Sequence, residues 1–299
     1  MTAASLAAPP VVHRRRLRPQ RVALYAFLTF MAVTWLFPLL WAIYTALRPY
    51  GDTLTRGYIS LPGVLNFDNF VNAWTQGNFP RFYLNSLVVA VPAVILTLLL
   101  ASMVAFAVSR FSWRFNVLLL MLFTAGNLLP PQVIIVPLYR LYLFLPLPRL
   151  ISDNGLIYDQ YVGIILIHIA FQTGFCVFVL SNYMRTLSRE LTEAALADGA
   201  PVWRIYWNVI LPLCRPALAA LATLEFTFIY NDFFWALLLM KSGDKRPITS
   251  ALNNLQGQFF TDTNLLAAGA MLVAIPTIIV YLVLQRHFIS GLTLGSTKG

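Results

Sequence analysis

Charge is the scarcest property of this sequence. Only 11% of its 299 residues are Asp, Glu, Lys or Arg, whereas 59% are hydrophobic. Soluble domains carry about 25% charged residues, so the composition excludes a soluble enzyme or a soluble binding module. It predicts an all-α integral membrane protein, because helices satisfy their own backbone hydrogen bonds within a membrane.

Residues that build reactive sites are also few. The three histidines, His13, His168 and His287, are scattered, and no Cys or carboxylate lies at ligand spacing from them, so no metal site is expected. Cys176 and Cys214 fall toward the cytoplasmic ends of predicted spans, where a disulfide is disfavoured, and we interpret them as small core residues. A G-x-x-x-x-G-K-[ST] phosphate loop is missing, so ATP hydrolysis by this chain is not expected.

Long apolar runs are abundant instead. A membrane-crossing helix needs about 20 mostly apolar residues. Six stretches qualify, at roughly 22–47, 84–108, 117–144, 161–180, 216–240 and 265–286. We expect a basic tail over 1–21, followed by one six-helix transmembrane domain over 22–299.

The basic residues predict the orientation of these spans. Lys and Arg are more frequent in the tail, in the loops after the second and fourth spans and at the C-terminus, although the opposite loops are longer. This bias predicts cytoplasmic N- and C-termini. The net charge of +10 is then explained by topology and by anionic lipid headgroups. Nucleic acid binding is therefore not expected.

Proline interrupts the third predicted span. Pro130, Pro131 and Pro137 lie inside its apolar run. Each removes a backbone donor and kinks a helix, and a membrane tolerates the freed carbonyls only where protein or a water-filled cavity satisfies them. This span is therefore expected to line the interior. In the outer loop over 48–83, Asn66 and Asp68 precede an amphipathic run that predicts a short helix on the outer face.

The segment over 185–212 is polar enough to stand outside the membrane. Ser188 suits an N-cap, Gly199 suits the left-handed position that ends a helix, and Pro201 suits the first turn of the next. Apolar residues then recur at helical spacing, at Val202, Ile205, Tyr206 and Val209. The pattern predicts two short helices joined by a sharp turn. They form either a docking element for a partner or an amphipathic connector resting on headgroups.

The same segment resembles the EAA motif of binding-protein-dependent ABC importer permeases. That motif has Glu-Ala-Ala, three residues, Gly, nine residues and then Ile-x-Leu-Pro. Here it is matched by Glu193, Ala194, Ala195, Gly199, Ile210, Leu211 and Pro212, and the one departure is Val209 in place of Ile. Asp198 before the glycine is similar to the carbohydrate branch. The stretches LNFDNFVNAW, VPLYRLY, IYNDFFWALLLM and RHFISGLTLGSTKG resemble its maltose-type subfamily, so the likeness extends over nearly the whole chain.

The resemblance implies a type I importer fold with a cytoplasmic coupling helix. It implies a sugar permease in a bacterial or archaeal cell membrane, paired with a second related permease, two cytoplasmic ATPases and an extracytoplasmic solute-binding protein. The partner ATPases would bind ATP and Mg²⁺, and this chain would hold no cofactor. ATPase coupling is assigned to the motif residues Glu193, Ala194, Ala195, Asp198, Gly199, Leu211 and Pro212.

Charged residues inside the spans are costly and usually face the protein interior. Glu225 and Asp232 are seven residues apart in the fifth span, so on one continuous helix they would share a face with Phe228 and approximately with Trp235. This face could line a sugar pathway or hold helices together through hydrogen bonds. The candidate pathway residues are Asn127, Gln172, Glu225, Tyr230, Asn231, Asp232 and Trp235.

One alternative function stays open from the residues. A secondary transporter or channel working alone could use Glu225 and Asp232 as proton or cation sites. Such a protein has no need of a docking helix, so the segment over 185–212 distinguishes the two hypotheses.

Overall fold

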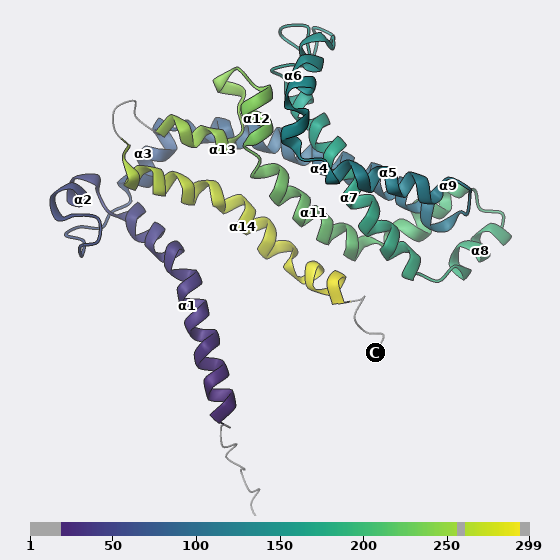
Figure 1. The fold of residues 1–299 in the computed structure, drawn as a ribbon, viewed down its shortest axis with the longest axis horizontal. Coiled ribbons are helices and arrows are strands. Elements are labelled where there is room, and N and C mark those ends of the chain that lie inside the picture. Colours follow the sequence, from purple (N-terminus) through teal and green to yellow (C-terminus); the bar gives the residue numbers. More distant parts are fainter. Residues whose placement is uncertain (1–18, 256–260, 294–299) are drawn as a thin grey trace, which may run out of the picture.

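The computed structural model describes residues 19–255 and 261–293, and every regular element in these ranges is a helix. Figure 1 shows their arrangement. The longer elements are α1 (Pro19–Leu47), α4 (Phe79–Arg110), α5 (Asn116–Leu128), α6 (Ile135–Phe144), α7 (Tyr161–Thr186), α11 (Arg215–Tyr230) and α14 (Thr263–Thr293). The shorter ones are α2 (Tyr50–Arg56), α3 (Asp68–Gln76), η1 (Pro131–Ile134), α8 (Glu190–Ala197), α9 (Val202–Ile205), η2 (Tyr206–Ile210), α10 (Leu211–Leu213), α12 (Phe234–Leu239), η3 (Gly243–Lys245), α13 (Ile248–Ala251) and η4 (Leu252–Leu255).

Four of these helices, α1, α4, α7 and α14, are individually long and apolar enough to cross a membrane. Two bent helix pairs bring the number to six if each pair counts as one span. The short helix expected in the outer loop is α3. Most of the tail predicted over 1–21 and the last six residues of the C-terminal stretch that resembles the family lie outside the described residues.

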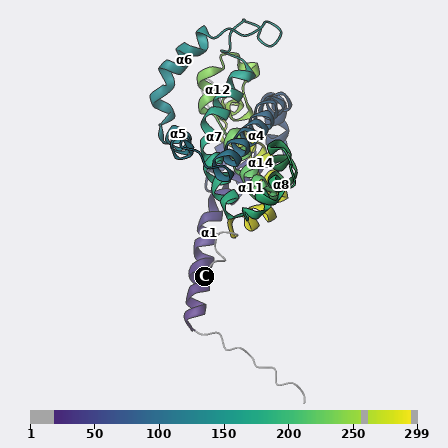
Figure 2. The same ribbon diagram turned by 90° about the vertical axis from the view of Figure 1, so that its right-hand side faces the viewer.

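The expectation of one kinked helix over 117–144 is wrong, because the chain breaks there into two. Leu129 is extended, at φ −74° and ψ 121°, and separates α5 from η1 and α6. A residue before proline is driven out of the helical region, and Pro130 and Pro131 follow Leu129 directly. The two halves meet at 86°, and α6 stands apart from the bundle in Figure 2.

The expectation of one continuous helix over 216–240 is also wrong. Helix α11 ends at Tyr230, and α12 begins only at Phe234. The Asp232 carboxylate accepts hydrogen bonds from the backbone N–H groups of Trp235 and Ala236. Short polar side chains that bond nearby backbone groups compete with helix continuation, which explains the interruption without any proline.

The bundle is built on α4, which packs along α7, while α11 packs against both α4 and α14. One buried cluster gathers around Phe79, Tyr230 and Trp235, and a second around Cys176 and Tyr206. Helix α1 diverges from this bundle in Figure 1, and among residues 19–47 only Ala46 is buried. Both cysteines are buried and free, as predicted.

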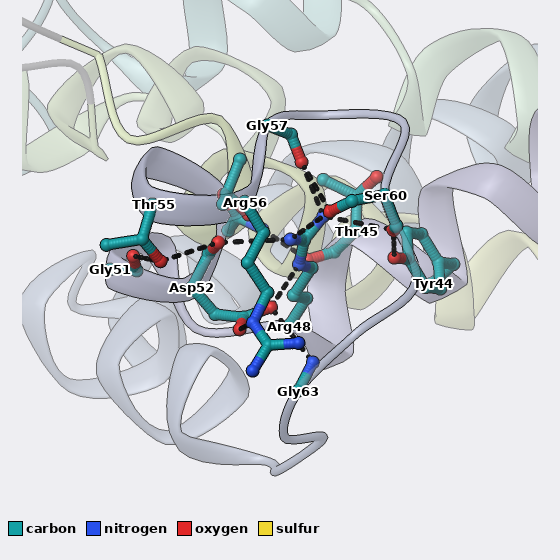
Figure 3. Close-up of polar contacts among 12 residues, drawn as sticks. Tyr44, Thr45, Arg48, Gly51, Asp52, Thr55, Arg56, Gly57, Ser60 and Gly63 are labelled. Atoms are coloured by element: carbon teal, nitrogen blue, oxygen red, sulfur yellow. Dashed lines mark hydrogen bonds and ion pairs between the residues drawn. The ribbon is translucent and has the colours of Figure 1, made fainter.

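A buried arginine organises the loop after α1. Arg48 is 1% exposed, and its guanidinium donates to the Asp52 carboxylate at 2.5 Å, to the Gly57 carbonyl and to the Ser60 hydroxyl. Figure 3 shows these partners converging on Arg48. The Arg48 hydrogen bond holds the pKa of Asp52 below its ordinary value. The charge is paired and fully hydrogen-bonded, as burial of a cation requires.

Candidate functional site

The turn between α8 and α9 is closed by backbone hydrogen bonds. Gly199 N–H donates to the Leu196 carbonyl, and Ala200 N–H donates to the Ala195 carbonyl, both at 3.0 Å. Gly199 has a φ of +75°, in the left-handed region that glycine tolerates best. This pair of bonds is the Schellman arrangement that ends helices. The predicted stop at Gly199 is therefore confirmed, and Ser188 accepts a hydrogen bond from Glu190 N–H at the other end of α8.

One side of the helix pair is fixed to the bundle. Ile205 and Ile210 are fully buried. The hydroxyl groups of Tyr206 and Ser102 of α4 form a hydrogen bond at 2.7 Å, and the rings of Tyr206 and Phe106 are 5.4 Å apart. Tyr206 therefore ties the segment after α9 directly to α4.

The opposite side of the pair is exposed. Glu193, Ala194, Asp198 and Gly199 are all exposed, and Ala195 is partly buried. Figure 1 places α8 at one extreme end of the molecule. Small and acidic side chains therefore cover a surface that another protein could approach closely.

Sequence analysis missed two exposed tryptophans beside this surface. Trp203 and Trp207 are 61% and 48% exposed. Their spacing of four residues, on the face opposite the apolar stripe, was the available signal. Large aromatic side chains are enriched among the residues that dominate protein interfaces.

Leu211 and Pro212 lie in α10, which leads directly into α11, and both are partly buried. The segment Val202–Leu213 meets α11 at 74°. A rigid-body shift of the helix pair would therefore push on α11 at an angle and not along its axis.

The break after α11 gathers several of the predicted pathway residues. The Asp232 side chain caps α12, and the backbone carbonyl oxygen of Asp232 accepts a 2.6 Å hydrogen bond from the Thr249 hydroxyl. His168 Nε2 lies 3.7 Å from an Asp232 carboxylate oxygen, too far for a hydrogen bond. Asn231 is exposed and donates to the Thr227 carbonyl and, at 3.3 Å, to the hydroxyl of Thr277 in α14. The break thus joins α7, α11, α13 and α14.

Aromatic rings flank the same break. Tyr230 is 1% exposed, and its buried hydroxyl has no hydrogen-bond partner among the described residues. Trp235 is 5% exposed, and its ring lies 5.2 Å from that of Phe171 in α7. Gln172, next to Phe171, is partly buried. The side chain of Asn127 lies outside the described residues.

Glu225 does not belong to this group. Its side chain is fully buried, and Cys176 Sγ lies 3.2 Å from one carboxylate oxygen. Phe228, which was expected to share its face, is 56% exposed. The prediction that Glu225 and Asp232 share one helix face is wrong, because it assumed a helix that continues past Tyr230. No cluster of three or more His, Cys, Asp or Glu side chains occurs in the parts of the chain that the structure describes.

A family profile described as the binding-protein-dependent transport system inner membrane component matches residues 94–293, which include the helix pair and the break. The chain belongs to this family. It is therefore an integral membrane ABC transporter permease, as the resemblance of its EAA segment implied.

Relatives match along most of their length. A probable ABC transporter permease of Pyrococcus horikoshii is 30% identical over 88% of this chain and 92% of its own. The diacetylchitobiose uptake permease of Streptomyces coelicolor is 31% identical over 92% of this chain and 88% of its own. The arabinooligosaccharide permease of Halalkalibacterium halodurans is 30% identical over 92% of this chain and 94% of its own.

A solved structure has the same fold. It is the crystal structure of a bacterial ABC transporter involved in alginate import, with a TM-score of 0.75 over 89% of this chain and 95% of the matched chain, at 23% identity. The permease therefore has the type I importer fold that the sequence predicted.

Proposed function

We propose that this permease is one half of the membrane channel of an ATP-driven carbohydrate importer. A second related permease would complete the channel, two ATPases would bind its cytoplasmic face, and a solute-binding protein would deliver the sugar on the other side. The oligosaccharide substrates named for its relatives support the carbohydrate class. Family membership disfavours the alternative of a transporter working alone.

The exposed helix pair carries the proposal for ATPase coupling. Two backbone hydrogen bonds close the C-terminal end of α8, and the Ser188 hydroxyl accepts from Glu190 N–H at its start. Glu193, Ala194 and Asp198 are exposed. A short helix closed by its own backbone keeps its shape when force is applied to it. Tyr206 passes its displacement to α4, and Leu211 and Pro212 pass it to α11. ATP-driven closure of the ATPases would in this way reorient the spans.

ATP and Mg²⁺ are assigned to the partner ATPases, because this sequence has no phosphate loop. The permease then contributes the helix pair that transmits the motion of the ATPases and part of the channel through which the sugar passes. Its helix pair stands on the ATPase side, so the orientation predicted from the basic residues places both termini in the cytoplasm.

The break after α11 is the proposed sugar path. Asn231 is exposed and has amide donors, Asp232 supplies carboxylate acceptors, and the buried rings of Trp235 and Tyr230 pack behind them. Hydroxyl-rich ligands are held by polar groups of this kind. Glu225 is assigned a structural role instead, because its carboxylate contacts Cys176 within the core.

The test is transport by purified components. The permease would be co-expressed with its second permease and the ATPases, then reconstituted in liposomes with the binding protein and a panel of mono- and oligosaccharides. We expect a stable complex and uptake that requires ATP and the binding protein. Uptake by the permease alone, without ATPase, would refute the proposal. ATP-dependent uptake of a non-carbohydrate solute, with no uptake of any sugar, would refute the carbohydrate substrate and leave the ATP-driven importer intact.

A further inference from the structure

A basic pocket lies where α4 and α7 end and α5 begins, beside the start of α8. It has a volume of about 340 Å³ and is lined by Arg110, Arg185 and Arg189, together with Ser109, Asn116 and Val117. Arg110 is the last residue of α4, and Arg185 lies in the last turn of α7. Both helices are membrane-spanning candidates, so their ends place the pocket at a membrane surface.

No carboxylate of the described residues pairs with the positive charge of this pocket. None of its three arginines forms an ion pair with any residue of the described ranges 19–255 and 261–293. Three guanidinium groups without a carboxylate make a site that favours an anion.

Arg110 is already positioned for a ligand. Its terminal nitrogens donate to the carbonyls of Met184, Leu187 and Ser188, which fixes the guanidinium at the C-terminal end of α7. Its Nε atom is buried and has no partner in the described part of the chain. A buried donor left without a partner costs free energy. An anion in the pocket would supply the missing acceptor.

The pocket opens onto an apolar surface of α5. Val117 lines the pocket, and the exposed side chains of Leu118, Met121 and Leu122 continue from it along the helix; Val117 and Leu118 are 63% and 61% exposed. Residues four apart lie on one helix face. A headgroup in the pocket would therefore have an apolar strip beside it for an acyl chain.

We propose that this pocket binds the headgroup of an anionic phospholipid, with the phosphate between Arg110, Arg185 and Arg189 and an acyl chain along α5. Basic pockets between membrane helices bind such headgroups. The buried Oδ1 atom of Asn116 has no donor among the described residues, and a headgroup hydroxyl, as in phosphatidylglycerol, can donate to it. The bound lipid joins the α4–α5 turn to the connection between α7 and α8. The proposal does not depend on the transported solute.

The first test measures lipid retention by the assembled transporter. The complex would be purified from nanodiscs that contain phosphatidylglycerol and phosphatidylcholine, and retained lipid measured by native mass spectrometry. We expect preferential retention of phosphatidylglycerol, reduced roughly 30-fold by Arg185→Gln with Arg189→Gln, because each basic residue near the membrane surface contributes on the order of 1 kcal/mol. Arg185→Lys with Arg189→Lys should keep most of the preference, because lysine also binds phosphate.

The matched control is Arg21→Gln with Arg114→Gln. It removes the same charge from exposed arginines that do not line the pocket. An equal loss of retained phosphatidylglycerol in both double variants would show non-specific attraction by the positive surface charge and would overturn the site. Unchanged retention in the pocket variant would overturn it as well. Loss of the ATPases with unchanged lipid preference would assign the arginines to the ATPase. Displacement of the lipid by millimolar inorganic phosphate would assign the pocket to a free anion.

A second measurement needs no variant. Photoactivatable phosphatidylglycerol in the wild-type complex should label peptides that contain residues 108–122 and 184–189. Labelling spread evenly over the membrane-facing helices, or missing from these peptides, would overturn the proposal even if the variants fail to assemble.

Discussion

The turn between α8 and α9 and the break between α11 and α12 both interrupt a helical path, and they are held in different ways. The first is closed by bonds within residues 195–200 of its own backbone. The second is held by side chains from other helices, including Thr249, which donates to Asp232, and Thr277 of α14, which bonds Asn231. The first can therefore move as a unit with whatever binds it, whereas the second changes only when the surrounding helices move.

The difference matches the two tasks of a coupled transporter. A coupling element has to keep its shape against a partner, and a solute path has to change when the helices rearrange. Four predictions separate the two regions, and each uses a control from the same chain.

The largest effect is expected at the exposed tryptophans. Trp203→Ser with Trp207→Ser should lower the affinity for the ATPases about 1,000-fold, since truncating a tryptophan that dominates an interface costs about 2 kcal/mol or more. The melting temperature of the permease should stay unchanged, because the two tryptophans are 61% and 48% exposed and contribute little to its core. Titration of the solubilised permease pair with ATPase measures the affinity. Trp113→Ser, at 47% exposure outside the helix pair, is the control and should have little effect.

A smaller effect is expected from the backbone of the first turn. Gly199→Val should lower ATPase affinity and uptake about tenfold, because the left-handed conformation costs an ordinary residue roughly 1–2 kcal/mol. Space is not the cause, since a Cβ at Gly199 would meet nothing within 4 Å. Gly199→Asn should remain near wild type because Asn tolerates this conformation. Identical behaviour of the two variants in the uptake assay would contradict a conformational role.

Asp232 tests the second region. Asp232→Ala removes the cap of α12 and should lower the free energy of unfolding by about 1 kcal/mol. Asp232→Asn keeps an acceptor oxygen, so it should leave the melting temperature nearly unchanged while it raises the KM for uptake severalfold. A change in melting temperature alone, in both variants, would make Asp232 purely structural.

The smallest effect concerns the link between the helix pair and α4. Tyr206→Phe removes the hydrogen bond to Ser102 and should cost about 1 kcal/mol. We expect ATPase binding to persist and the ratio of sugar transported to ATP hydrolysed to fall severalfold. Tyr183→Phe is the control, because its hydroxyl makes an exposed 3.3 Å bond to the Leu213 carbonyl. If both variants couple normally, Tyr206 does not transmit the motion.

The first turn could be predicted from sequence because its signals are local. Ser188, Gly199 and Pro201 each act on their own or adjacent backbone. The residue spacing of the EAA segment also indicated the permease family. The structure confirms the fold and the turn, while the coupling role of Glu193 and Asp198 stays a prediction.

The second region could not be predicted for the opposite reason. No proline or glycine lies between Tyr230 and Phe234, so the sequence reads as a continuous helix. The groups that stabilise the break are distant, with Thr249 17 residues and Thr277 46 residues away from their partners. The contact of Glu225 with Cys176 spans 49 residues. Only the packing of the helices brings these pairs together.

The contacts at the C-terminal end of α1 have a consequence for biosynthesis. The Thr45 carbonyl accepts a hydrogen bond from Asn264, 219 residues later in the chain, and Asn264 also donates to Thr53. These contacts cannot form until the ribosome has translated the beginning of α14. During nearly all of synthesis, α1 therefore has to remain in the bilayer through its own apolar surface and the early Arg48 loop. Its final docking is one of the last events of assembly.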